Sequence, residues 1–145
     1  MEENILEPVP EFKLYNEMSV RIGTFIGGPL VAGLMIAENF KQLGQHEKVK
    51  NTWLISVAVT VLVFGCAFFI PGIERLSPYL IPLCYGWAAS LLMRHFQGKE
   101  LDRHQEKGGQ LYSAWRVALI TLIGLLISVA VFFILISLSD KQFTW

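Results

Sequence analysis

The sequence predicts an all-α, polytopic membrane protein whose four transmembrane helices form two hairpins. Hydrophobic residues make up 53% of the 145 residues and charged residues only 17%. A soluble domain of this size needs charged positions spread over its whole surface. Here the charges are clustered instead, and they leave four stretches without Asp, Glu, Lys or Arg: 22–37, 51–73, 76–93 and 117–139.

The length of these stretches supports the membrane interpretation. A helix of 23 residues, as in 51–73 and 117–139, is about 35 Å long and exceeds a hydrocarbon core of about 30 Å. The stretch 22–37 gives only about 24 Å by the same rise per residue. It therefore needs Arg21 to snorkel at one end and Asn39 and Phe40 to extend the other. A soluble helical bundle is disfavoured because 51–73 and 117–139 lack a polar stripe.

Outside the helices, the sequence predicts polar ends and two kinds of link. Residues 1–17 form an acidic N-terminal tail, 18–140 the transmembrane domain and 141–145 a short C-terminal tail. Pro71-Gly72 ends the second helix and predicts a tight antiparallel turn. The third helix is expected to continue beyond Arg94 into water, and Gly108-Gly109 is expected to stop it.

The distribution of basic residues predicts the orientation. The links 38–50 and 94–116 hold eight Lys and Arg residues, and the opposite side holds four, namely Lys13, Arg21, Arg75 and Lys141. The positive-inside rule then places both links in the cytoplasm and both termini outside. We expect the membrane to be a bacterial inner membrane.

The first helix carries the most unusual motif. Gly23 and Gly27 form a GxxxG pair, a spacing that lets two helix backbones approach closely in lipid. Pro29 lacks an N–H group and disfavours helical geometry at Gly28, so the helix should kink or break there. Together with Gly33, these residues allow two interpretations. In the first, the helix is kinked and closely packed, and the Phe25 carbonyl that Pro29 leaves without a donor is bonded by Thr24 or a neighbour. In the second, the helix is broken and binds a solute.

The same motif carries a resemblance. The run Gly27-Gly28-Pro29-Leu30, followed by Asn39-Phe40-Lys41, resembles a group of small uncharacterised bacterial membrane proteins. Gly108-Gly109 with Ser113 and Trp115 is similar to the same group. The resemblance implies a four-helix membrane protein and implies no activity.

Motifs that would indicate chemistry are missing from the sequence. No charged residue lies inside a predicted span, which disfavours a proton-coupled exporter. His46, His95 and His104 occur without HExxH or paired-Cys spacing, so we expect no metal, no cofactor and no enzymatic activity. The formal net charge of zero argues against nucleic acid as a partner.

Two functions remain open. The charges lie only at the ends of the predicted spans, and the first helix has a face of small residues. Both features favour an interaction module or a subunit of a membrane complex, with a protein partner or a homo-oligomer. The alternative is a small oligomeric transporter or channel, which is favoured by the Pro-broken helix.

Overall fold

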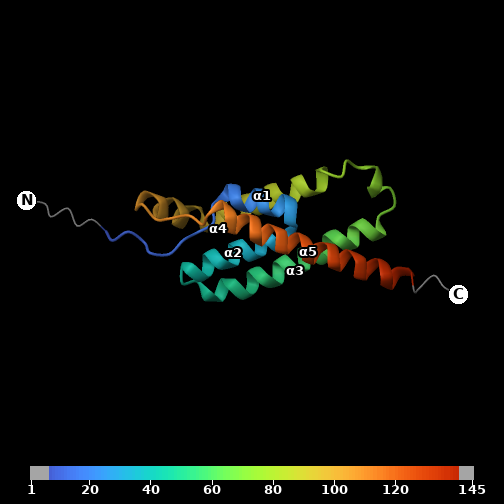
Figure 1. Cartoon of the computed structure of the whole chain (residues 1–145), viewed down its shortest axis with the longest axis horizontal. Coiled ribbons are helices and arrows are strands. Elements are labelled where there is room, and N and C mark those ends of the chain that lie inside the picture. Colours follow the sequence, from blue (N-terminus) through green and yellow to red (C-terminus); the bar gives the residue numbers. More distant parts are fainter. Residues whose placement is uncertain (1–6, 141–145) are drawn as a thin grey trace, which may run out of the picture.

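The computed structural model describes residues 7–140, and within this range the chain is all-α (Figure 1). The α-helices are α1 (Glu17–Gly27), α2 (Pro29–Gln42), α3 (His46–Phe69), α4 (Leu80–Glu106) and α5 (Ala114–Asp140). A 3-10 turn, η1 (Ile73–Arg75), lies between α3 and α4. The predicted tail 141–145 and residues 1–6 lie outside the described range.

The stretch expected to be a single first span is two short helices. The chain reverses at Gly28, so α1 and α2 run back along each other as an antiparallel pair (Figure 1). With 11 and 14 residues, they are about 16 and 21 Å long, and neither reaches the roughly 30 Å of a hydrocarbon core. The prediction of one first transmembrane helix is therefore wrong, because the break at Gly28-Pro29 turns the chain around.

The α1–α2 pair is the centre of the molecule. Helix α3 packs on α2, α4 packs mainly on α1, and α5 packs mainly on α1. The three long helices make few contacts with one another, such as that of Phe68 of α3 with Phe132 of α5, whose ring centres are 5.9 Å apart. Of the two predicted hairpins, the first is present in part, because α2 packs on α3. The second is absent, because α4 and α5 each pack on α1 and not along one another.

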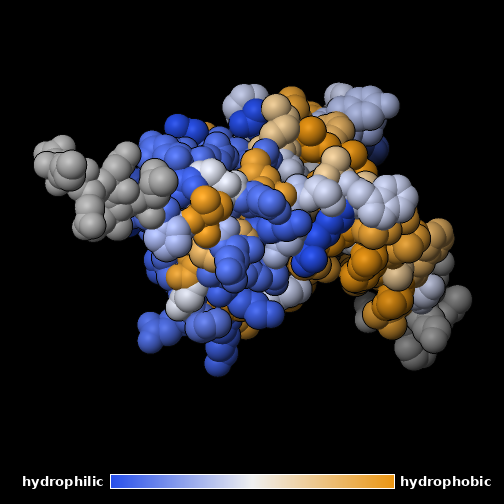
Figure 2. All heavy atoms as spheres, turned by 60° about the vertical axis from the view of Figure 1, so that its left-hand side comes forward, coloured by the Kyte–Doolittle hydropathy of each residue, from blue (hydrophilic) through white to orange (hydrophobic). Residues whose placement is uncertain are grey.

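Two helices, α3 and α5, are long and apolar enough to cross a membrane. Only 6% of the apolar window of α3 and 11% of that of α5 are buried inside the protein. A core helix of a soluble protein would be mostly buried, whereas these helices expose Val61, Leu62, Leu126 and Phe133. Figure 2 shows hydrophobic side chains gathered on one part of the surface and hydrophilic ones on the other. These observations indicate membrane association.

The described part of the N-terminal segment is docked on the bundle and is not a free tail. Leu14 and Tyr15 are each 1% exposed. Leu14 pairs with Leu111 in an isolated parallel bridge, and Glu7 forms an ion pair with Lys107. The Lys107 ammonium lowers the pKa of the Glu7 carboxyl from its ordinary value.

These contacts place the N-terminal segment at the same end of the molecule as the α2–α3 and α4–α5 links. We call this the link end. The sequence predicted that the N-terminal tail and the two links lie on opposite sides of the membrane. This prediction is wrong, because the chain reversal at Gly28 brings the tail and the links to the same end of the molecule. Helix α5 then runs away from the link end (Figure 1).

Two sequence expectations about helix ends are confirmed. Helix α4 continues past Arg94 to Glu106, and Gly108 follows with φ 76°. Helix α3 ends at Phe69, just before Pro71, and Gly72 has φ 90°. Glycine accepts such left-handed geometry without the steric cost that a Cβ would bring.

Candidate functional site

The candidate site from the sequence is centred on the break between α1 and α2. Gly28 has φ 90° and ψ 176°, a conformation that residues with a Cβ rarely adopt. Its N–H donates to the Thr24 carbonyl at 2.9 Å and so closes the end of α1. Pro29 is the first residue of α2, where its missing N–H costs nothing because that position has no helical partner. The helix is thus broken at this site, with a defined geometry on both sides.

A neighbouring helix satisfies the end of α1. The Ser128 hydroxyl of α5 donates to the Gly27 carbonyl at 3.1 Å. A Cβ on Gly28 would lie 3.1 Å from the same Ser128 oxygen. The hydroxyl of Thr24, which the sequence suggested as the donor, has no hydrogen-bond partner. The Gly27 carbonyl at the break is therefore bonded by protein, and its donor comes from α5.

Gly23 and Gly27 lie where α1, α2 and α5 meet. A Cβ on Gly27 would come within 2.5 Å of Val31 Cγ2 and 2.8 Å of the Thr121 carbonyl oxygen. A Cβ on Gly23 would come within 2.8 Å of Met35 Cε and 3.1 Å of Thr121 Oγ1. Both glycines thus permit close approach of helices, as small residues do in lipid.

Small residues also mark the contacts of the other two long helices. Gly33 of α2 lies against Ser56 of α3, and a Cβ on Gly33 would be 2.2 Å from the Ser56 Cβ. Gly86 of α4 lies against α1, where an added Cβ would be 3.2 Å from the Arg21 carbonyl oxygen. Each long helix therefore reaches the central pair through a glycine contact.

A second group of polar side chains is buried at the link end, centred on Asn39. Asn39 is 1% exposed. It accepts the Tyr15 N–H at 2.8 Å and donates to the Tyr15 carbonyl at 2.9 Å. It also donates to Gln97 Oε1 at 3.2 Å, while Gln97 Nε2 donates to the Ile36 carbonyl at 2.9 Å. Asn39 therefore ties the N-terminal segment to α2 and α4.

The Tyr15 ring extends this group towards α5. Its hydroxyl accepts a hydrogen bond from Arg116 Nε at 2.9 Å, and its ring lies 4.3 Å from that of Tyr112. Tyr112 donates to Glu38 at 3.2 Å. Burial raises the pKa of the Tyr15 phenol and outweighs the opposing effect of Arg116, so Tyr15 stays neutral at physiological pH.

The three histidines do not converge. His104 is buried; its Nε2 lies 2.8 Å from the Gln110 carbonyl, and its ring stacks on Phe12. His95 packs edge-on against Phe96, and His46 begins α3. Within residues 7–140, no three His, Cys, Asp or Glu side chains are close enough together to hold a metal ion.

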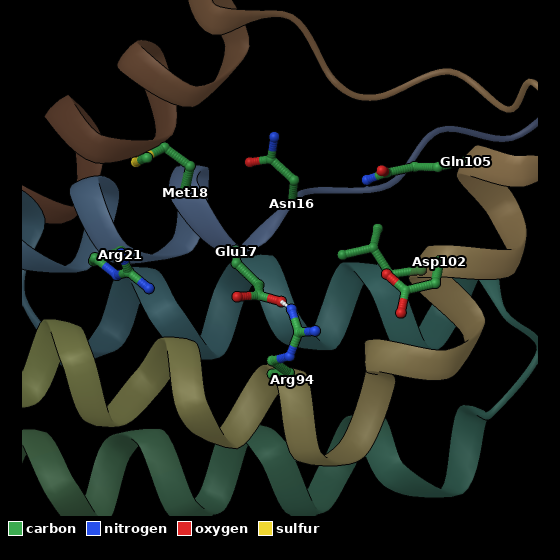
Figure 3. A pocket seen from close by; sticks show the side chains of 8 residues that line it. Asn16, Glu17, Met18, Arg21, Arg94, Asp102 and Gln105 are labelled. Atoms are coloured by element: carbon green, nitrogen blue, oxygen red, sulfur yellow. Dashed lines mark hydrogen bonds and ion pairs between the residues drawn. The ribbon is translucent and has the colours of Figure 1, made fainter.

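A polar cleft of about 320 Å³ opens between the start of α1 and α4. Figure 3 shows the Glu17–Arg94 ion pair on its wall. Arg94 Nη1 lies 2.6 Å from Glu17 Oε1. Arg21 also lines the cleft; its guanidinium stacks 4.1 Å from the Trp87 ring centre, and its Nε donates to Ser90. Glu17 and Arg94 are thus paired with one another, and Arg21 is held against α4.

Comparison of the chain with protein-family models, curated proteins and solved structures finds no match. Sequence reasoning found the broken helix but missed Asn39 and Gln97 as buried side chains. A buried amide has the same local sequence as any polar residue at a helix end, so the sequence held no clear signal for them.

Proposed function

We propose that the chain is an integral membrane protein with three membrane-crossing helices and a re-entrant α1–α2 pair. In this arrangement α3, α4 and α5 cross the bilayer, and the α1–α2 pair enters from the link end and returns to it. Residues 80–93 of α4 are uncharged, and the preceding loop completes the crossing. Irregular backbone at membrane depth is tolerated where protein buries it, as at Gly28.

The basic residues support one orientation of this arrangement. Eleven Lys and Arg residues lie within 7–140. Ten of them lie in the N-terminal segment, the early turns of α1, α3 and α5, the last turn of α2, or the part of α4 from Arg94 onward with its link, and only Arg75 lies at the opposite end. This asymmetry is steeper than the eight-to-four count expected for four spans. By the positive-inside rule, the link end and the N-terminal segment face the cytoplasm, and α5 leads out of it.

Thiol labelling tests this topology. In a background with Cys66→Ala and Cys84→Ala, single cysteines at Val9, Gln105 and Ser77 are exposed to an impermeant maleimide in intact cells. We expect Ser77→Cys to react, and Val9→Cys and Gln105→Cys to react only after permeabilisation. Labelling of Val9→Cys with protection of Gln105→Cys would restore the four-span arrangement, and labelling of both with protection of Ser77→Cys would invert the orientation.

We further propose that the protein works by association, as an interaction module or subunit of a membrane complex. The observation that carries this proposal is the protein contact at the break. The Ser128 hydroxyl bonds the Gly27 carbonyl, and a Cβ on Gly28 would lie 3.1 Å from the same oxygen. An ion or solute site in a bilayer needs charged groups, converging polar groups or unwound backbone left free. Here the unwound backbone packs against α5, while α3 and α5 expose long apolar faces to lipid or to a partner.

The second candidate is a small oligomeric transporter or channel, which the break at Gly28 favours because discontinuous helices form solute sites in transporters. Flux through liposomes separates the two functions. We expect reconstituted protein to show no selective ion or solute flux, and Pro29→Ala to leave this unchanged. Native mass spectrometry in mild detergent is expected to show a homo-oligomer or a co-purified partner. Selective flux that Pro29→Ala abolishes would contradict association as the function.

A further inference from the structure

An apolar groove runs between α3 and α4, with α2 as its floor. It exists because α3 and α4 each pack on the central pair and not on one another. Its volume is about 470 Å³, within the usual range for small-molecule sites. Most of its surface is apolar, and its walls include Ile36, Ile55, Val59, Ala88, Ala89 and Leu92.

The two ends of the groove differ in polarity. Lys48, Asn51 and Thr52 line the end near the α2–α3 link. Lys48 also lies 5.4 Å from the centre of the Phe40 ring, which belongs to the same end. The other end reaches Pro29, beside the break between α1 and α2. The groove therefore combines one cationic, polar mouth with an apolar body.

The mouth lies at the depth of lipid headgroups in the proposed topology. Trp53, 39% exposed, follows Lys48 by little more than one turn of α3, and Trp115, 74% exposed, begins α5 at the same end. Exposed tryptophans at span ends mark the membrane–water interface. Lys48 is thus placed in the cytoplasmic leaflet, whose surface carries anionic lipids.

The dimensions of the groove suit a hydrocarbon chain. Its floor from Pro29 to Phe40 is about 16 Å long at the helical rise per residue. Its volume of about 470 Å³ is spread along that length, so the groove is long and narrow, as an extended acyl chain is.

We propose that this groove binds an anionic glycerophospholipid, with one acyl chain between α3 and α4 and its phosphate beside Lys48. The acyl chain covers the apolar surface of the groove, and the phosphate pairs with the Lys48 ammonium at the membrane–water interface. The groove also contains the unpartnered Ser56 hydroxyl, 6% exposed, on its wall. This inference rests on the proposed cytoplasmic position of the link end, which the cysteine labelling tests independently.

Native mass spectrometry of the full chain with added phosphatidylglycerol or phosphatidylcholine of identical acyl chains tests the proposal. We expect one tightly retained phosphatidylglycerol per chain and at least fivefold weaker binding of phosphatidylcholine. Lys48→Gln should remove most of this preference, whereas Lys50→Gln, on the same helix but outside the groove lining, should keep it. Equal retention of both lipids by the unmodified chain would overturn the headgroup assignment.

A second pair of variants tests the chain-binding part. Ala88→Phe fills the groove, and Ala58→Phe adds the same bulk on an exposed face of α3 outside it. We expect only Ala88→Phe to lose the retained lipid, and a mid-chain diazirine on the phosphatidylglycerol to label α3 and α4 peptides around Ile55 and Ala88. Unchanged retention by Ala88→Phe, or a dimer that this variant dissociates, would overturn the lipid as occupant.

Discussion

Replacing Gly27 with leucine is expected to cause a large loss of stability. A Cβ at this position would lie 2.8 Å from the backbone carbonyl oxygen of Thr121 and 2.5 Å from Val31 Cγ2. A side chain can rotate away, but the Thr121 carbonyl belongs to the α5 backbone, so the helix itself must move. Overpacking a tight contact costs about 1–3 kcal/mol, and more where backbone is displaced. Thermal unfolding in detergent measures the effect as a lower midpoint.

The chain supplies a matched control for this substitution. Gly65 lies in α3, and an added Cβ there meets nothing within 4 Å. Gly65→Leu should therefore leave the unfolding midpoint unchanged or raise it slightly, because leucine also has the better helix propensity. Equal midpoints for Gly27→Leu and Gly65→Leu would show that Gly27 faces lipid and that α5 does not pack on the break.

The long helices were predictable because their signal is local. A run of apolar residues fixes where α3 and α5 lie, and Gly108 and Pro71 fix where α4 and α3 end. The stop at Gly108 needs no tertiary information, since a glycine after a polar helical extension is enough. The apolar runs 51–73 and 117–139 match α3 and α5 apart from a few residues at their ends.

The path of the chain at Gly28 was not predictable in the same way. Gly28-Pro29 predicts a break in the helix. The same local sequence is compatible with a kinked span and with a full reversal of the chain. The reversal depends on contacts between distant residues, such as Gly23 with Met35 and Gly27 with Ser128. The positive-inside count is consistent with the reversal, because Lys13 and Arg21 are two of the four basic residues that the four-span arrangement places on the minority side. Moving them to the link end removes two of the four residues on that side, Arg75 and Lys141 being the other two.

The same dependence on distant contacts explains why the buried amides were missed. Asn39 follows Glu38 and precedes Phe40 and Lys41, a polar helix end like many others. Its role appears only when the N-terminal segment folds back across α2 and presents the Tyr15 backbone to it. That segment itself was read as a tail because its acidic residues suggested exposure, whereas Leu14 and Tyr15 are its buried anchors.

Replacing Asn39 with alanine is therefore expected to release the N-terminal segment from the bundle. The change leaves the buried N–H and carbonyl of Tyr15 and the Oε1 of Gln97 without their partner. An unpaired buried polar group costs about 1–3 kcal/mol. Opening the segment to water relieves that cost, so the docked state should lose about 2 kcal/mol, or roughly 30-fold in its opening equilibrium. Hydrogen exchange at the Tyr15 amide and tryptic cleavage after Lys13 should both accelerate accordingly.

Gln42→Ala is the control for this prediction, because Gln42 bonds only the Glu38 side chain within the same helix among the hydrogen bonds of the described residues. It should leave both readouts at their original rates. The loss in Asn39→Ala should be confined to the N-terminal segment, since the Gly27–Ser128 contact lies about 12 residues of α2 away from Asn39. If exchange at Tyr15 stays slow in Asn39→Ala while the unfolding midpoint falls, Asn39 stabilises the α2–α4 contact through Gln97 and does not hold the segment.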